Sequence, residues 1–95
     1  MTDWKTPEHL EDHCGRHRRE LGTRSIEEYD TSARETIAIG VRFMYRDRGT
    51  GERRIGYFHR ESSRMTALDL DGFIHSHFRT DEAYVAELPR STYQD

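Results

Sequence analysis

The chain has 95 residues, which is the size of one domain with a single small core. Charged residues make up 35% of it and hydrophobic residues 33%. The formal net charge of -3 argues against nucleic-acid binding driven by the overall charge of the protein. No apolar run is long enough to cross a bilayer, and no basic-then-apolar leader opens the chain, so we expect a cytoplasmic protein with no membrane partner. The single cysteine, Cys14, excludes an internal disulfide and a multi-cysteine zinc site.

Two helices are expected first. Thr6 followed by Pro7 is a helix start, because the threonine hydroxyl can cap and a proline at the first helical position loses no hydrogen bond. This helix is expected over residues 7–21 and stops at Gly22. Ser25 and Glu28 have the spacing of a capping box, which predicts a second helix from residue 26 to about residue 40.

After Gly40 the hydrophobic period changes to two, which is typical of strands. Four strands are expected, at residues 41–46, 53–59, 64–70 and 73–79. Asp71-Gly72 is the signal for a two-residue type I′ hairpin, and a short helix over residues 81–88 follows. The predicted fold class is α+β, with two N-terminal helices packed on a four-stranded antiparallel meander and a short C-terminal helix. We expect one domain over residues 1–95, with flexible ends at 1–6 and 90–95.

The last strand carries the triplet His75-Ser76-His77. Strict alternation places the two histidines on one face and Ser76 on the other. Two register pairs follow from the hairpin: Ala67 opposite Ser76, and Met65 opposite Phe78. Both faces are partly apolar, so two arrangements stay open. Ser76 approaches the first helix if its own face is buried, and if the other face is buried the histidines cluster and a metal site becomes plausible.

His13 and His17 are four residues apart, so both lie on one face of the first helix. A histidine pair with nearby arginines and a hydroxyl is what metal-free RNA cleavage requires. One imidazole takes the proton of the 2′-hydroxyl, an acid protonates the departing 5′-oxygen, and arginine and hydroxyl donors stabilise the charged phosphorane. Histidine suits this chemistry because its ordinary pKa lies near neutrality.

Fourteen of the fifteen cationic residues are arginines, and they fall mainly into two segments. Residues 16–24 carry a net charge of +3 and residues 42–64 a net charge of +4, so a local cationic cleft is compatible with the acidic total. The guanidinium group of arginine can bind a phosphate with two parallel hydrogen bonds. Tyr57 is a candidate for stacking on a base, and the candidate phosphate contacts in these segments are Arg16, Arg18, Arg24, Arg54, Arg60 and Arg64.

Several motifs resemble one known family. They are His13-Cys14-Gly15-Arg16-His17, then Ser25-Ile26-Glu27-Glu28-Tyr29, and later Asp71-Gly72-Phe73-Ile74-His75-Ser76-His77. Together they are similar to the barnase/colicin-D/RelE-like bacterial ribonuclease toxins, in which a histidine-bearing helix precedes a Ser/Thr-x-Glu-Glu-Tyr helix and an Asp-Gly turn leads into a strand with a small hydroxyl residue. The similarity covers about residues 10–80.

The resemblance implies metal-independent cleavage of RNA, with transfer RNA as one candidate, leaving a 2′,3′-cyclic phosphate and needing no cofactor. By position it makes His17 and His13 the catalytic histidines and Ser76 the hydroxyl residue of the last strand. We expect Ser76 and Arg16 to stabilise the phosphate, with His77 in reserve. A cognate antitoxin or immunity protein is the implied partner. Two alternatives stay open: a non-catalytic binding or regulatory module of the same fold, and a histidine-based metal-binding protein.

Overall fold

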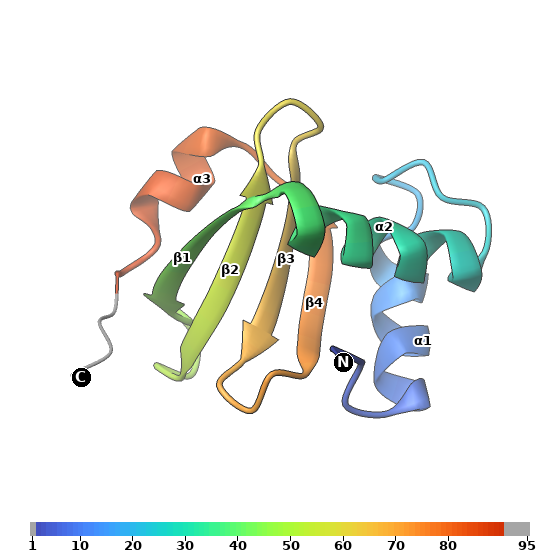
Figure 1. Ribbon diagram of the computed structural model, residues 1–95, viewed down its shortest axis with the longest axis horizontal. Helices are drawn as coiled ribbons and strands as arrows, with labels where there is room; N and C mark the ends of the chain where they lie inside the picture. Colours follow the sequence, from blue (N-terminus) through green and yellow to red (C-terminus); the bar gives the residue numbers. More distant parts are fainter. Residues whose placement is uncertain (1, 91–95) are drawn as a thin grey trace.

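The computed structural model describes residues 2–90 and has the expected α+β class. The elements, in chain order, are α1 (Pro7–His17), α2 (Ile26–Ile39), β1 (Val41–Arg46), β2 (Arg53–His59), β3 (Arg64–Asp69), β4 (Ile74–Arg79) and α3 (Glu82–Glu87) (Figure 1). No helix within residues 2–90 has the length and apolar character that a membrane span needs. The expected flexible end at 90–95 falls, beyond Arg90, outside the described residues.

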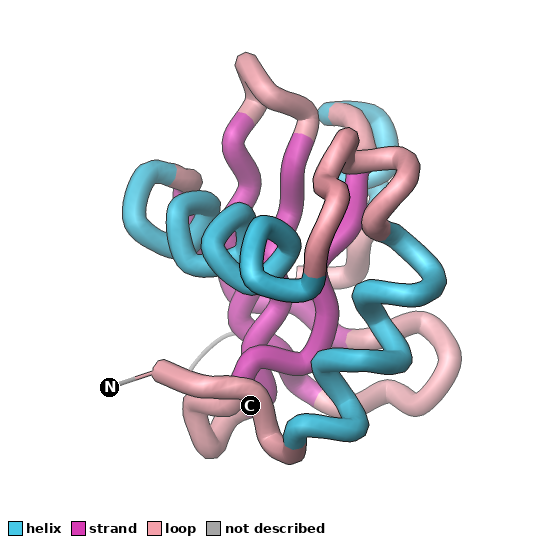
Figure 2. The backbone as a smooth tube through the Cα atoms, turned by 90° about the vertical axis from the view of Figure 1, so that its right-hand side faces the viewer, coloured by secondary structure: helices cyan, strands magenta, loops and turns pink. Residues whose placement is uncertain are grey.

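The sheet has the order β1-β2-β3-β4, with every neighbouring pair antiparallel. Helix α2 crosses one face over β2 and β3, and α1 runs beside the edge strand β4 (Figure 1). Helix α3 lies on the opposite face from α2 (Figure 2). Both faces of the sheet are therefore partly covered, which answers the question that the sequence left open about the buried face.

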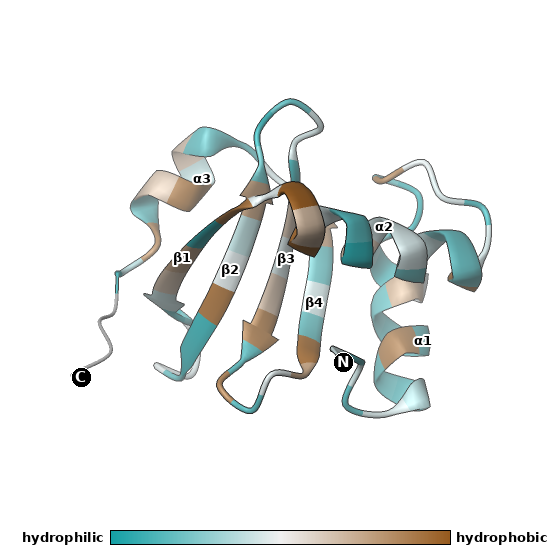
Figure 3. Cartoon of the chain, viewed as in Figure 1, coloured by the Kyte–Doolittle hydropathy of each residue, from teal (hydrophilic) through white to brown (hydrophobic). Residues whose placement is uncertain are grey.

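Each face has its own apolar core. On the α2 face, Tyr29 and Ala33 of α2 pack with Leu68 of β3. On the other face, Val85 of α3 packs with Met65 of β3. The brown apolar bands in Figure 3 are confined to short stretches of each element, so each core is thin. A thin core leaves room for polar side chains beside it, and both cores have histidines at their margin.

The helix starts form as their sequence predicts. The hydroxyl of Thr6 accepts a hydrogen bond from the backbone N–H of His9, and that of Ser25 accepts one from Glu28. Helix α1 ends at His17 rather than near residue 21, and hydrogen-bonded turns continue the chain to Gly22, whose φ of 71° is left-handed. The turn still buries Leu21 at the end of the α2-side core.

The segment before α1, expected to be a flexible end, is anchored over residues 2–6. Trp4 is 5% exposed, and its indole N–H donates a hydrogen bond to Asp30 of α2 at 2.8 Å. The backbone N–H of Ile74 donates to the carbonyl of Asp3, so this segment pairs with the edge of β4. Burial of this large aromatic side chain stabilises the contact between the segment and α2.

The turn between β3 and β4 differs from the expected two-residue hairpin. The carboxylate of Asp69 accepts hydrogen bonds from the N–H groups of Asp71 and Phe73, which makes a longer loop with Gly72 at a φ of 91°. A β-bulge at His75 then absorbs the extra residue, because Leu68 pairs with Ile74 while Ala67 pairs with Ser76. The predicted pairs of Ala67 with Ser76 and of Met65 with Phe78 are confirmed.

Candidate functional site

A cluster of histidines lies between α1 and the edge strand β4. Along α1, His9, His13 and His17 follow one another at intervals of one turn, and His75 of β4 faces the first two. The ring centroids of His9 and His13 are 4.5 Å apart, and those of His13 and His75 are 5.8 Å apart. We call His9, His13, His17 and His75 the histidine cluster.

His13 is the buried member of this cluster, with 6% of its surface exposed. A guanidinium nitrogen of Arg16 lies 3.2 Å from its Nε2 and 2.7 Å from the carboxylate of Asp12. Because a guanidinium group can only donate, Nε2 of His13 is the acceptor, and the ring proton of the neutral imidazole is on Nδ1. Burial, followed by the positive charge of Arg16, lowers the pKa of His13 to about 4.

His75 meets a buried arginine from β2. Arg54 is 4% exposed, and its Nη1 lies 2.8 Å from Nδ1 and 3.0 Å from Nε2 of the His75 ring. Its other terminal nitrogen pairs with the carboxylate of Glu52 at 3.2 Å. Burial and the charge of Arg54 lower the pKa of His75. The backbone carbonyl of His75 accepts a hydrogen bond from Nε2 of His9 at 2.6 Å.

His17 lies at the solvent end of the cluster. Its ring is 6.0 Å from that of His13 and nearly parallel to it, and Phe78 packs on it at 6.0 Å. The Nδ1 atom of His17 donates to the carboxylate of Glu20 at 3.1 Å. This bond fixes the ring so that Nε2 is the nitrogen with a lone pair.

Two buried side-chain atoms within residues 2–90 have no hydrogen-bond partner, and both border His75. They are Nδ1 of His13 and Nε of Arg54. In the protonation state just described, both atoms are N–H donors. An unpaired buried donor costs roughly 1–3 kcal/mol, so the site lacks an acceptor that a ligand could supply.

Ser76 lies on the same face of β4 as His75, because the bulge gives both residues the position opposite Ala67. His77 points to the other face, where it bonds to α2. The expectation that His75 and His77 share a face is therefore wrong. It assumed unbroken alternation, which the bulge interrupts.

His77 belongs to a second polar group, buried under α2, which we call the His77 network. The side chain of His77 is fully buried, and its Nε2 accepts from the hydroxyl of Ser32 at 2.9 Å. Its Nδ1–H faces the hydroxyl oxygen of Thr66 at 2.8 Å and the carbonyl of Met65 at 3.1 Å. Thr66 in turn donates to the carbonyl of Ala33. Burial lowers the pKa of His77 to about 4.

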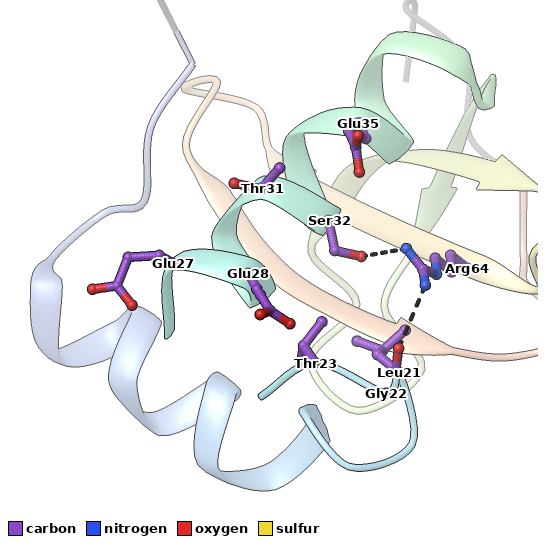
Figure 4. A pocket seen from close by; sticks show the side chains of 9 residues that line it. All are labelled: Leu21, Gly22, Thr23, Glu27, Glu28, Thr31, Ser32, Glu35 and Arg64. Atoms are coloured by element: carbon purple, nitrogen blue, oxygen red, sulfur yellow. Dashed lines mark hydrogen bonds between the residues drawn. The ribbon is translucent and has the colours of Figure 1, made fainter. Parts of the chain in front are cut away.

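Arg64 completes the His77 network from the floor of an open pocket of about 380 Å³ between α2, the α1–α2 loop and β3 (Figure 4). Its guanidinium donates to the hydroxyl of Ser32 at 2.8 Å and to the carbonyl of Leu21 at 3.4 Å. Both terminal nitrogens thus have partners within the protein. Arg64 fixes α2 and the preceding loop against β3.

The structure brings only part of the expected site together. His13, Arg16 and His17 lie on α1, Arg54 joins them through His75, and Ser76 lies on the same sheet face as His75. Three of the expected phosphate or base contacts, Arg24, Tyr57 and Arg64, lie elsewhere, as does His77; Arg64 and His77 belong to the network under α2. Arg24 is exposed in the α1–α2 loop, and Tyr57 packs against the α2-side core.

His9 is the member of the cluster that the sequence analysis missed. It lies one turn before His13, so the spacing His9-x-x-x-His13-x-x-x-His17 contained the signal. The sequence indicated His75 as a candidate, but its contact with Arg54 depends on the bulge and could not be predicted. No protein-family model, curated protein or solved structure matches the chain.

Proposed function

We propose that this protein is a ribonuclease that binds a phosphodiester of RNA at the histidine cluster and cleaves it without a metal ion. The observation that carries the proposal is the pair of buried donors without an acceptor, Nδ1 of His13 and Nε of Arg54. A non-bridging phosphate oxygen is an acceptor-only group and would satisfy such donors. The exposed Arg16 adds a positive charge beside His13, with a guanidinium nitrogen 3.2 Å from its Nε2.

His17 is the general base in this proposal. Its Nδ1 is held by Glu20, so Nε2 can take the proton of the 2′-hydroxyl. The 2′-oxygen attacks phosphorus, which forms one P–O bond and breaks the bond to the 5′-oxygen. The 5′-oxygen takes a proton from solvent, and His17 later returns its proton to solvent. The products are a 2′,3′-cyclic phosphate and a 5′-hydroxyl.

His13, Arg16 and Ser76 stabilise the phosphorane in this scheme. His13 donates from Nδ1, and Arg16 and Ser76 supply charge and a hydroxyl from the two sides of the cluster. The resemblance of the α1 and β4 motifs to the ribonuclease toxins supports the same reaction. A nuclease that attacks cellular RNA, with transfer RNA as one substrate, would act in the cytoplasm and require a cognate antitoxin or immunity protein.

The test is incubation of the purified chain with total transfer RNA in EDTA. We expect discrete fragments ending in a cyclic phosphate, and a rate about 10²–10⁴-fold lower for His17→Ala, because a general base is lost. His59→Ala is the matched control, since His59 lies at the end of β2 and bonds Ser62 instead of the cluster. Intact RNA after incubation with the wild-type chain would refute the proposal. Binding of that RNA without cleavage would favour the non-catalytic binding module.

A further inference from the structure

We infer that His9, His13 and His75 together bind one divalent transition-metal ion of the kind that imidazole favours, such as Zn²⁺. One ring nitrogen from each of the three residues lies within 4.8 Å of the other two. A tetrahedral zinc ion with bonds of about 2.0–2.1 Å needs its nitrogen ligands about 3.3 Å apart. Side-chain rotations that shorten the nitrogen–nitrogen distances by up to about 1.5 Å therefore close the site. Imidazole nitrogens suit zinc, copper and nickel.

The orientation of His9 matches that of a metal ligand. Its Nε2–H donates to the backbone carbonyl of His75, which leaves Nδ1 with the lone pair. Histidines that bind metals almost always donate their other N–H to a carbonyl or carboxylate in this way. His9 and His13 also lie one helical turn apart on α1, so one rigid element carries two of the three ligands.

The second observation is the unsatisfied state of His13. Its side chain is more than nine-tenths buried, and Nδ1 has no partner. Its other nitrogen bonds only to Arg16, whose side chain is 57% exposed and already paired with Asp12. Arg16 can therefore turn away at small cost. The ring proton of His13 can then move to Nε2, so that Nδ1, the nitrogen without a partner, offers its lone pair to the metal ion.

The arginines beside the site do not exclude a cation. Arg16 is paired with Asp12 and Arg54 with Glu52, so each positive charge has a nearby negative one. Arg54 keeps its bond to Glu52 when the metal replaces its contact with His75. A metal ion on His13 would remove a donor that the phosphate needs. The inferred site therefore inhibits RNA cleavage, and this last step alone rests on the proposed function.

The test is titration of the purified chain with Co²⁺, followed by visible absorbance, and with Zn²⁺, followed by calorimetry. We expect one ion per chain. In the variant His9→Gln we expect affinity to fall by about tenfold or more, because the glutamine amide can still donate to the His75 carbonyl but offers no imidazole ligand. His59→Gln, which removes a histidine outside the cluster, should bind as the wild type does. Circular dichroism checks that each variant is folded.

A second ligand variant, His75→Gln, tests the site from β4 in case His9→Gln does not fold. Equal affinity in the wild type and both ligand variants, or no binding by the wild type, would overturn the inference. Cleavage assays with and without Zn²⁺ separate the two proposals. Inhibition of wild-type cleavage by Zn²⁺, at the concentrations at which the ion binds, supports both. Metal binding with no cleavage in any condition removes the nuclease alone, and cleavage with no metal binding removes the metal site alone.

Discussion

His13 and His77 are both buried, and each has a pKa lowered to about 4, yet their surroundings differ in one respect. Every ring nitrogen of His77 has a partner within the protein, through Ser32, Thr66 and Met65. His13 has one ring nitrogen bonded to an exposed arginine and the other to nothing. A fully satisfied buried imidazole stabilises the fold, whereas an unsatisfied one marks a place where a ligand belongs. Burial and pKa alone would not have separated the two.

Substitution of each histidine by leucine tests this comparison most directly. His77→Leu leaves the hydroxyl groups of Ser32 and Thr66 without their partner in the core, and we expect the free energy of unfolding to fall by about 3 kcal/mol. His13→Leu removes a donor that was already unpaired, so we expect a change within about 1 kcal/mol. Chemical denaturation of both variants at pH 7 measures the two effects. Equal losses would show that the two sites do not differ.

We expect the two histidines to contribute in the same way to the pH dependence of the free energy of unfolding. Their folded-state pKa values of about 4 lie below the ordinary value of 6.5, so the unfolded chain binds more protons between these values. The stabilisation that these two neutral histidines contribute is therefore fully present above pH 6.5, and it is lost as the pH falls toward 4. Each group adds a slope of up to about 1.4 kcal/mol per pH unit.

Both groups face other charges that modulate this slope. His77 faces Arg64, His17 and Glu20, and His13 faces Arg16 and the other members of the histidine cluster. Denaturation curves between pH 4 and 7 measure the slope in the wild type and in each leucine variant. We expect either variant to have a shallower curve than the wild type. A slope unchanged in both would contradict the lowered pKa values.

The two serines extend the comparison with a smaller effect. Ser32 bridges His77 and Arg64 under α2, so Ser32→Ala should cost about 1 kcal/mol of stability and leave RNA cleavage near the wild-type rate. Ser76 is half-buried beside His75, so Ser76→Ala should change stability by no more than about 0.5 kcal/mol while slowing cleavage. Thermal unfolding and the transfer-RNA assay measure both. If Ser32→Ala slowed cleavage and Ser76→Ala cost stability, the His77 network would be the reactive site and the histidine cluster the structural one.

The elements were predictable from the sequence because their signals are local. The hydroxyls of Thr6 and Ser25 cap helices, and the alternation after Gly40 gives the four strands. The site was predictable only in part. His13 and His17 share a helix face, which spacing alone reveals, whereas the contact of Arg54 with His75 joins β2 to β4 across β3. No local pattern encodes a contact of that kind.

The same limit explains the error on the strand triplet. The carboxylate of Asp69 holds two backbone N–H groups and lengthens the loop, and the strand compensates with one extra residue at His75. An alternation pattern is read along one strand only. It therefore cannot predict a bulge, which depends on how the strand pairs with its partner. The pairs farther from the loop were nevertheless correct, because the longer loop and the bulge cancel.

The bulge also determines which side of the sheet each histidine of β4 serves. In an uninterrupted strand, His75 and His77 would serve the same side, and β4 could contribute either to the interior or to a reactive surface. The bulge instead directs them to opposite faces. His75 contacts Arg54 in the histidine cluster, and His77 bonds to Ser32 under α2, although only two positions separate them in the sequence. One strand therefore serves both the hydrogen-bonded interior under α2 and the histidine cluster beside α1.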